Sequence, residues 1–137
     1  MPINCGVLQG SVLGPILFSV YVNDLPLCLK ADCNMFADDT TVHSNHSKVE
    51  EVISSLQENI NLLLEWSELN HMSLHPYKTK YMIVTTRQKR QNLCTFSGAL
   101  NITRNHIEEV SFHKVLGVVI DNNKSWYKHG EMLCKNL

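Results

Sequence analysis

Residues 47–68 constrain the fold of this chain more than any other stretch of it. Apolar side chains recur there at every third or fourth position, namely Val49, Val52, Ile53, Leu56, Ile60, Leu63 and Leu64. This spacing places them on one face of an α-helix and leaves the other face polar. Ser47 and Glu50 stand at the spacing of a capping box, which predicts where the helix starts. Because an amphipathic helix must bury its apolar face, we expect it to cover a sheet.

Segments rich in apolar and β-branched residues predict the strands of that sheet. Residues 34–43 pass from an apolar stretch through Asp38 and Asp39 into a threonine-rich stretch, which favours a tight hairpin with an acidic tip. Residues 80–85 predict another strand, and residues 110–121 predict a strand pair or one strand bent at Gly117. Together these segments predict an α+β fold, with helices packed on an antiparallel sheet, rather than alternating βαβ units.

A further helix is expected near the N-terminus, because residues 11–25 are mostly apolar. Ser11 can cap this helix and Pro15 can occupy its first turn. Pro26 disfavours helix in the residue before it, which predicts that the helix ends near residue 25.

Length and composition fit an ordinary soluble globular domain. The chain has 137 residues, of which 44% are hydrophobic and 18% charged, which is enough to bury a core. Residues 12–29 are the longest apolar stretch, but Gly, Pro, Asn and Asp interrupt it, so no membrane span is predicted. No signal peptide is visible. We therefore expect an intracellular chain, not a secreted one, whose five cysteines are free thiols, mostly in the core.

Charge divides the chain into two unlike halves. Residues 1–68 hold two of the 12 Lys and Arg residues and nine of the 13 Asp and Glu residues. Residues 69–137 hold the other ten basic residues and the other four acidic residues. One region then suits cations and the other suits a polyanion. Ordinary variation in surface charge explains the same asymmetry equally well.

The adjacent carboxylates of Asp38 and Asp39 are the main chemical feature. Two such groups repel each other and are tolerated where solvent or cations neutralise them. At a hairpin tip they can bind Mg²⁺ through carboxylate oxygens. Two-metal phosphoryl transfer needs carboxylates that converge from different strands, with the ions about 3.5–4 Å apart. A bare pair of aspartates is more often an ordinary turn, so the surrounding residues decide between the two interpretations.

Five ordered blocks of the chain resemble the reverse transcriptases of non-LTR (LINE-type) retrotransposons. They are residues 7–18 with 21–25, residues 36–39 (Phe-Ala-Asp-Asp), the set Trp66, Asn70, Leu74, Lys78, Thr79 and Met82, residues 115–121, and the set Trp126, His129 and Lys135. The resemblance extends over nearly the whole chain, and the order and spacing of the blocks make it specific. It implies a polymerase palm domain, with an RNA template, a DNA primer and dNTP as partners in the intact enzyme.

The resemblance implies roles for the residues of the acidic block. Asp38 would be the metal ligand, with Asp39 beside it near the primer terminus, so both are catalytic and metal-binding candidates. Mg²⁺ is the implied cofactor, in a two-metal site that is incomplete here. Phe36 would lie under the primer end or the incoming nucleotide.

The other blocks imply contacts with nucleic acid. Gln9, Gly10 and Ser11 would border the template and the nascent base pair, where a glycine lets a base approach closely. Lys78 would contact the incoming triphosphate or protonate pyrophosphate; a solvated surface lysine is the alternative. Leu116 and Gly117 would shape the hairpin that grips the primer.

The same resemblance implies that part of the polymerase is missing. The family carries another essential aspartate in a block before the Gln-Gly-Ser segment, and this chain begins only a few residues before that segment. We therefore expect a partial palm, with the fingers and the first catalytic strand absent. Residues 1–90 would be the truncated palm, and residues 91–137 its end, with the primer-grip hairpin leading towards the thumb. Because electrostatic clamping supplies most of the rate in phosphoryl transfer, we expect no activity from this chain alone.

Two functions remain open. The chain is either a fragment of an RNA-directed DNA polymerase, or a non-enzymatic remnant that acts, if expressed, as a nucleic-acid-binding or interaction module. An open reading frame upstream of Met1 that leads into an aspartate-bearing block favours the first, and a stop or frameshift favours the second. A viral RNA-dependent polymerase palm is less favoured, because those usually carry Gly where this chain has Ala37. Missing strands would leave a sheet edge and an apolar helix face uncovered, so we also expect poor solubility.

Overall fold

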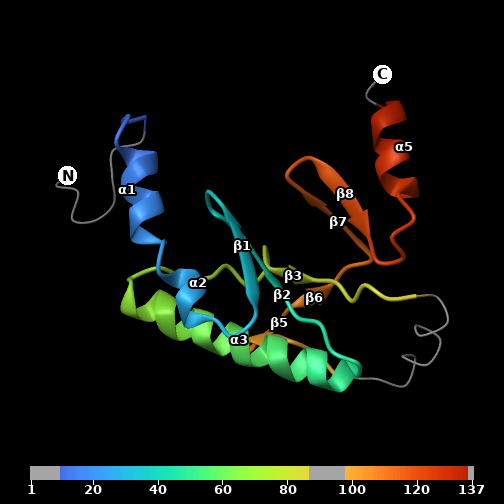
Figure 1. Cartoon of the computed structure of the whole chain (residues 1–137), viewed down its shortest axis with the longest axis horizontal. Coiled ribbons are helices and arrows are strands. Elements are labelled where there is room, and N and C mark those ends of the chain that lie inside the picture. The colour runs from blue at the N-terminus through green and yellow to red at the C-terminus, as the bar shows by residue number, and fades with distance from the viewer. Residues whose placement is uncertain (1–9, 87–97, 136–137) are drawn as a thin grey trace.

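The computed structural model describes residues 10–86 and 98–135, which form a mixed α and β structure (Figure 1). The helices are α1 (Gly14–Tyr21), α2 (Leu25–Cys28), α3 (Val49–Leu69) and α5 (Tyr127–Lys135). The strands are β1 (Asp32–Phe36), β2 (Asp39–His43), β3 (Lys80–Tyr81), β4 (Asn101–Ile102), β5 (Asn105–His106), β6 (Glu108–Glu109), β7 (Phe112–Val115) and β8 (Val118–Asp121). This mixture of helix and strand agrees with the predicted α+β class.

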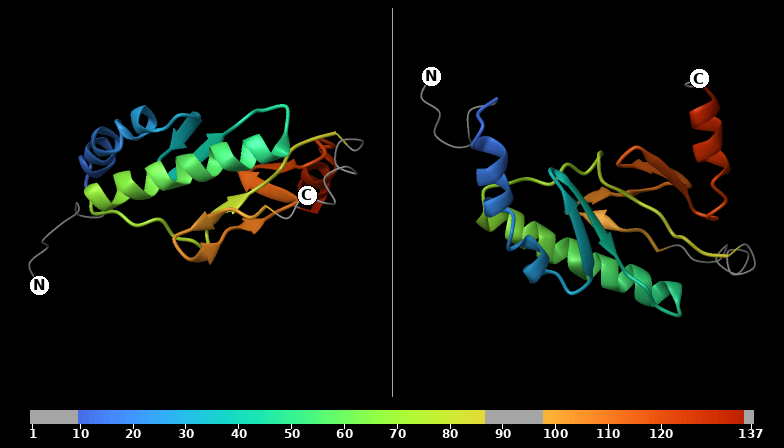
Figure 2. Two further views of the ribbon diagram at one scale, coloured as in Figure 1. Left: turned by 90° about the horizontal axis from the view of Figure 1, so that it is seen from below. Right: turned by 45° about the horizontal axis from the view of Figure 1, so that its top comes forward.

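Helix α3 lies in the middle of the molecule, with β1 and β2 along one side and the later strands along the other (Figure 2). The apolar face predicted from the sequence is the face that packs. Its Ile53 is buried against Leu100, Ile102 and Ile107, and half-buried apolar side chains surround this first core cluster. Full burial of one such side chain is worth about 1.5–3 kcal/mol, so the cluster holds β4 against α3.

The start of α3 differs from the prediction. The residue before the helix is Lys48, which has an extended backbone, and no side chain caps the free N–H groups of the first turn. Ser47 and Glu50 therefore do not form a capping box, because the helix begins one residue later than the box requires. A cap is worth only about 1 kcal/mol, and Val49 instead packs against the first core cluster.

Two short helices replace the single N-terminal helix that we expected. α1 ends at Tyr21, and α2 begins at Leu25 after a turn. Pro15 lies in the first turn of α1, as predicted, and Pro26 lies in the first turn of α2. The first turn of a helix needs no N–H from its residues, so a proline fits there. Pro26 thus opens a new helix.

A second core cluster joins these helices to the C-terminal half of α3. Val22, Leu25 and Trp66 are buried together, with the half-buried side chains of Phe18, Met35 and Leu63 packed against them. The described part of the chain therefore has two small cores, one at each end of α3.

In residues 10–86 and 98–135, four separate two-stranded sheets take the place of the single antiparallel sheet that we expected. The pairs β1–β2, β4–β5 and β7–β8 are antiparallel hairpins, whereas β3 and β6 pair in parallel. The predicted strand 80–85 is reduced to the two residues of β3, and further on Thr85 N–H donates to Asn122 O at 3.2 Å. Strands of two residues form too few hydrogen bonds to build a wide sheet.

The C-terminal segment is a hairpin, the first of the two alternatives predicted for residues 110–121, followed by a helix. β7 and β8 are joined at Leu116 and Gly117, and α5 follows β8 after a short turn. In Figure 1, α1 and α5 project from the same side of the molecule at opposite ends. The predicted boundary between residues 90 and 91 lies outside the described residues, so the division of the chain stays a prediction.

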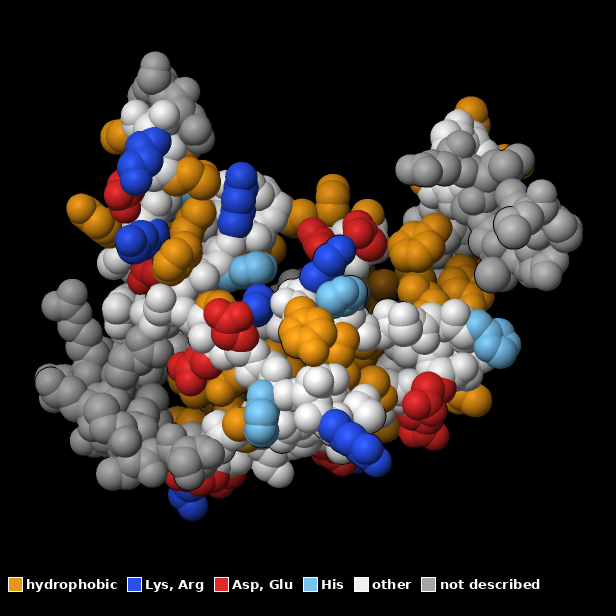
Figure 3. All heavy atoms as spheres, turned by 180° about the vertical axis from the view of Figure 1, so that it is seen from behind, with side chains coloured by type: hydrophobic (Ala, Val, Ile, Leu, Met, Phe, Trp, Pro, Cys, Tyr) orange, Lys and Arg blue, Asp and Glu red, His pale blue; other side chains and the backbone are white. Residues whose placement is uncertain are grey.

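Apolar side chains of α1 and the residues before it lie open to solvent, as we expected of an uncovered helix face. The exposed fraction is 87% for Val12 and 71% for Val20, and Leu13, Ile16 and Leu17 are also exposed. Figure 3 shows hydrophobic side chains gathered on the surface beside this helix. The effect on solubility stays a prediction.

Among the helices that the structure describes, none is long and apolar enough to cross a membrane.

Three cysteines lie in the described residues, and all three are free thiols, as predicted. Their predicted place in the core is wrong for Cys28 and Cys134, which are exposed. Cys33 is half-buried in β1, and burial raises the pKa of its thiol, which keeps the thiol neutral and less reactive.

Candidate functional site

The hairpin β1–β2 presents Asp38 and Asp39 at its tip. Its register pairs Phe36 with Asp39, so Ala37 and Asp38 alone form the turn. Ala37 has a φ of 52°, in the left-handed region that glycine adopts more readily. The tight acidic hairpin predicted from the sequence is thus present, and it holds its alanine in a strained conformation.

Both carboxylates at this tip are open to solvent. Asp38 and Asp39 are exposed, and the neighbouring ring of Phe36 is 63% exposed. In the part of the chain that the structure describes, no ion pair involves either aspartate. Solvent therefore hydrates the two charges, and a cation can approach them from outside.

Carboxylate oxygens are ligands that Mg²⁺ prefers, so Asp38 and Asp39 have suitable chemistry for this ion. They come from one turn, however, and across residues 10–86 and 98–135 no group of three or more His, Cys, Asp or Glu side chains could hold a metal ion. The described residues therefore fit one arm of a Mg²⁺ site and do not fit a complete two-metal centre. No catalytic step through the ions follows from these residues alone.

Gly10 and Ser11 lie just before α1. Gly10 has a φ of 85°, and nothing lies within 4 Å of the position that a Cβ would take there. Glycine is therefore favoured by the backbone conformation and not by crowding. The Ser11 hydroxyl accepts a hydrogen bond from Gly14 N–H at 3.2 Å, which supports the start of α1. Gln9, the other candidate of this block, lies outside the described residues.

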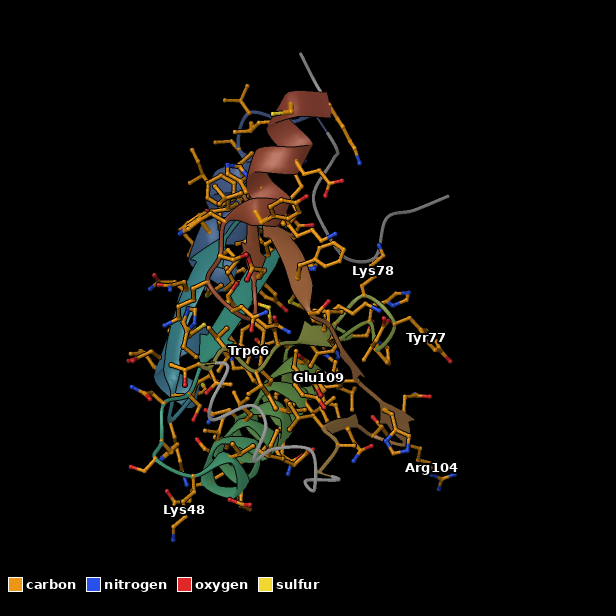
Figure 4. All side chains as sticks on the ribbon, turned by 90° about the vertical axis from the view of Figure 1, so that its right-hand side faces the viewer. Lys48, Trp66, Tyr77, Lys78, Arg104 and Glu109 are labelled. Carbon is orange, nitrogen blue, oxygen red and sulfur yellow. The ribbon has the colours of Figure 1, made fainter. Side chains whose placement is uncertain are left out.

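Lys78 lies in the turn that leads into β3. Its N–H donates to His75 O at 3.1 Å, and its side chain is exposed. In Figure 4, Lys78 and Tyr77 point outward on the side opposite to β1 and β2. Within the described ranges, no hydrogen bond or ion pair joins Lys78 to Asp38 or Asp39. A contact of Lys78 with triphosphate therefore stays a prediction.

Leu116 and Gly117 form the two-residue turn of the hairpin β7–β8. Their φ angles are 48° and 88°, and a turn with both central residues at positive φ matches the twist of the flanking strands. Leu116 is 59% exposed. The structure confirms the hairpin that the sequence predicted, whereas its contact with a primer stays a prediction.

Asp121 carries a role that we did not predict. Its carboxylate accepts hydrogen bonds from the N–H groups of Asn123, Ser125 and Trp126, and from the Ser125 hydroxyl. The Ser125 N–H foremost, and then these other donors, hold the pKa of this carboxyl below its ordinary value. Asp121 thus fixes the turn between β8 and α5. An aspartate a few residues before a helix is the signal that sequence reasoning could have used.

Residues from separate blocks of the sequence meet at the second core cluster. The Trp66 indole N–H donates to Asp24 Oδ1 at 3.2 Å, and the Tyr21 ring stands edge-on to the Trp66 ring at 6.5 Å. The Tyr21 hydroxyl donates to Asn70 O. The side chains of Tyr21, Asp24 and Trp66 and the backbone carbonyl of Asn70, all from blocks that resemble the family, therefore hold α1 and α2 against α3.

A model of the reverse transcriptase (RNA-dependent DNA polymerase) family matches residues 1–120. The match extends over most of the chain and includes the acidic hairpin and the Leu116–Gly117 turn. The chain belongs to the reverse transcriptase family.

Curated relatives narrow this class to retrotransposons of the non-LTR type. The chain is 29% identical over 136 residues to the RNA-directed DNA polymerase from mobile element jockey of Drosophila melanogaster. The aligned region covers 93% of this chain and 14% of the relative. It is 28% identical over 132 residues to the probable RNA-directed DNA polymerase from transposon BS of the same species, and this region covers 90% of the chain and 14% of the relative. The chain is 26% identical over 129 residues to the retrovirus-related Pol polyprotein from type-1 retrotransposable element R1 2 of Nasonia vitripennis, and this region covers 90% of the chain and 31% of the relative.

The predicted resemblance to non-LTR reverse transcriptases is therefore confirmed. The chain spans 14% of the length of the first of these relatives. No solved structure matches the chain.

Proposed function

We propose that this chain is the part of a non-LTR retrotransposon reverse transcriptase that carries the acidic hairpin of the polymerase palm. Within the longer protein it would take part in RNA-templated DNA synthesis, with an RNA template, a DNA primer and dNTP as partners. The main support for the proposal is the exposed pair Asp38–Asp39 at the tip of a hairpin with a two-residue turn, in a chain of this family.

Asp38 and Asp39 would each offer carboxylate oxygens to Mg²⁺ at this tip. Bound Mg²⁺ would neutralise negative charge on the transferring phosphoryl group. The remaining ligands would come from the rest of the longer protein and from the substrates, because two adjacent carboxylates cannot enclose two ions. The exposed ring of Phe36 offers a flat apolar surface on which a base or sugar can pack.

The other candidates would act around this tip. Gly10 and Ser11 would border the template and the nascent base pair, and Lys78 would bring a positive charge to the incoming triphosphate. Leu116 and Gly117 would form the turn that meets the primer. Each of these roles needs the rest of the polymerase to bring the parts together, since Lys78 makes no hydrogen bond or ion pair with the acidic tip in the described residues.

A primer-extension assay tests whether the chain acts alone. The purified 137-residue chain receives a homopolymer template with its primer, Mg²⁺ and dNTPs. We expect no extension above background, because an incomplete ligand set cannot clamp the transferring phosphoryl group. Clear processive extension would show that the proposed inactivity is wrong.

A chimera tests the role of the hairpin itself. The matching segment of an active relative, such as the jockey polymerase, is replaced by this chain, and extension is measured. Asp38→Asn in the chimera should lower the rate of extension by about a hundredfold or more, because stabilisation of phosphoryl charge by metal ions is worth several kcal/mol. Asp32→Asn is the matched control, since Asp32 is an exposed aspartate at the far end of β1. Equal activity of the two variants would contradict the proposal.

A further inference from the structure

Two residues on one face of α3 each hold a different part of the proposed site. Asn59 and Trp66 are seven positions apart, about two helical turns, so their side chains leave the helix in nearly the same direction. Both are buried, with exposed fractions of 1% and 5%. Neither is part of the acidic tip or of the Gly10–Ser11 segment, yet each is connected to one of them.

Asn59 holds the base of the acidic hairpin. Its Oδ1 accepts hydrogen bonds from the N–H groups of Lys30 at 2.8 Å and Ala31 at 3.0 Å, the two residues before β1. Its Nδ2 donates to Ser55 O at 2.8 Å, which fixes the orientation of the amide. The Lys30 ammonium also pairs with Glu58 at 2.6 Å. The chain therefore enters β1 at a point that is tied to the middle of α3.

The chemistry of Asn59 is specific to this task. A buried polar side chain costs free energy unless it is hydrogen-bonded, and an apolar side chain of similar size would fill the same space. That apolar side chain would leave the N–H groups of Lys30 and Ala31 without their acceptor. Packing alone therefore does not explain an asparagine at this position.

Trp66 holds the junction of α1 and α2. It packs with Val22 and Leu25, and its indole N–H donates to Asp24 Oδ1 at 3.2 Å. The other end of α1 leads back to Ser11, whose hydroxyl supports the first turn of that helix. Figure 4 shows Trp66 inside the molecule, away from the outward-pointing Tyr77 and Lys78.

We propose that Asn59 and Trp66 are positioning residues, which use α3 as a common platform to set the acidic hairpin relative to the Gly10–Ser11 segment. Asn59 sets the hairpin, and Trp66 sets α1. The geometric part of this inference stands on the contacts alone, whereas its consequence for DNA synthesis rests on the proposed function.

Hydrogen exchange of single amides in the full 137-residue chain tests the geometric part. Asn59→Leu keeps the volume and removes the acceptor. We expect exchange at Lys30 and Ala31 to become roughly tenfold faster, and the resonances of Asp38 and Asp39 to shift, while those of Gly10 and Ser11 stay in place. Trp66→Phe keeps an aromatic ring and removes the indole donor, and should shift the resonances of Gly10 and Ser11 more than those of Asp38 and Asp39, because Met35 of β1 also packs against the cluster of Trp66.

The matched control is Asn61→Leu. Asn61 is an exposed asparagine of the same helix that accepts a hydrogen bond from Gln57. The same substitution there should shift the resonances of neither the acidic hairpin nor the Gly10–Ser11 segment. Faster exchange spread evenly over the chain in Asn59→Leu would overturn the inference, because it would indicate a general loss of stability.

A conservative variant covers the case in which Asn59→Leu does not fold. Asn59→Asp keeps an oxygen acceptor for both N–H groups. Slow exchange at Lys30 and Ala31 in this variant supports the inference, and fast exchange there with an otherwise protected helix α3 overturns it.

The chimeric polymerase separates this inference from the proposed function. If the positioning role and the proposed function are both correct, Asn59→Leu lowers kcat about tenfold with little change in the KM for dNTP. Asn59→Asp then restores part of kcat. If Asp38→Asn leaves the chimera active, the proposed function is wrong, and the exchange results still decide the geometric part.

Discussion

The hairpins β1–β2 and β7–β8 both have two-residue turns, but they expose different chemistry. Each turns through two residues, and each has at least one of them at positive φ. The first tip presents the carboxylates of Asp38 and Asp39, whereas the second presents the apolar side chain of Leu116 beside Gly117. A turn of two residues thus presents charged carboxylates to cations in one hairpin and an uncharged edge in the other.

The two hairpins also differ in what holds them to the rest of the molecule. β1–β2 is anchored by the neutral amide of Asn59, which bonds to residues 28 and 29 positions away. β7–β8 is anchored to α5 by the Asp121 carboxylate, which bonds to residues two to five positions away. His129 Nδ1 adds a second point by accepting a hydrogen bond from Val119 N–H at 3.3 Å.

The Asn59 anchor of β1–β2 is therefore a tertiary contact, whereas the side-chain anchors between β7–β8 and α5 join residues close together in the sequence. The Asn59 amide is a long-range neutral anchor, which responds to changes in α3 and does not itself titrate. A local carboxylate anchor responds to pH and leaves the distant hairpin unchanged. Four variants or conditions test this difference.

Asp121→Ala should have the largest effect. It removes the acceptor of the N–H groups in the turn that leads into α5. Without this turn the start of α5 loses its support, so exchange of the α5 amides should become roughly tenfold faster, while the β1–β2 amides keep their protection. Hydrogen exchange followed by NMR measures both regions in one sample. Asp32→Ala, at an exposed aspartate of β1, is the control. Equal loss of protection in both hairpins would show that they are not independent.

Gly117→Ala should destabilise the chain by about 1–2 kcal/mol, because a side chain at positive φ places its Cβ close to the following carbonyl oxygen. Nothing lies within 4 Å of the new Cβ, so the whole cost comes from the backbone. Urea unfolding measures the change, with Leu116→Ala as the control for an altered side chain in the same turn. An unchanged midpoint would mean that the turn adopts another conformation in solution.

Ala37→Gly should stabilise the chain, and by less than Gly117→Ala destabilises it. Relief of the positive φ at Ala37 is worth about 1–2 kcal/mol, and the greater freedom of glycine in the unfolded chain costs about 0.4–1 kcal/mol. The net expectation is a gain in unfolding free energy of about 0.5–1 kcal/mol. Ala99→Gly, at an alanine that is not among the positive-φ residues, should lose stability. A loss at both positions would contradict the strained turn.

Acid should produce the smallest effect, which we expect at the Asp121 contacts between β8 and α5. Hydrogen bonds, foremost from the Ser125 N–H, lower the pKa of Asp121 below its ordinary value of 3.8. Its contribution to stability is therefore present above that value and is lost as pH falls through the lower pKa of the folded state. The loss is partial, because a protonated carboxyl still has an acceptor oxygen.

NMR of the α5 amides during acid titration measures this loss. The amide of Ala31 serves as the internal control, because its acceptor, the Asn59 amide, does not titrate and Ala31 has no ionisable side chain. Asp121→Asn should remove only the part of the acid dependence that comes from the turn before α5, because Lys135 and Lys128 also lower the pKa of Glu131 within this helix. A simultaneous change at both anchors would contradict the proposed contrast.

Much of the local structure was predictable because its causes are local. The spacing from Val49 to Leu64 gives α3 its apolar face, and the Asp38–Asp39 and Leu116–Gly117 positions mark the two turns. The start of α3 was not predictable, because packing of Val49 on the core outweighs a cap that would begin one residue earlier. The opening of α2 at Pro26 was missed because proline both ends and starts helices.

The parallel pair β3–β6 shows the limit of local patterns. Lys80 and Glu108 are 28 residues apart, and both strands have only two residues, so neither carries a periodic signal. Their pairing depends on the first core cluster, which brings Tyr81 and Ile107 to the same side of α3.

The sequence by itself determined the long helix, the two tight hairpins and the acidic pair at the first tip, because each arises from residues close together in the chain. It also carried the ordered blocks that place the chain in the reverse transcriptase family. Only the tertiary structure decided that Asn59 anchors the acidic hairpin, that Trp66 anchors α1 and that Asp121 anchors α5. The first two anchors join segments far apart in sequence, and hydrogen-bond partners at such distances are selected by packing and not by local pattern.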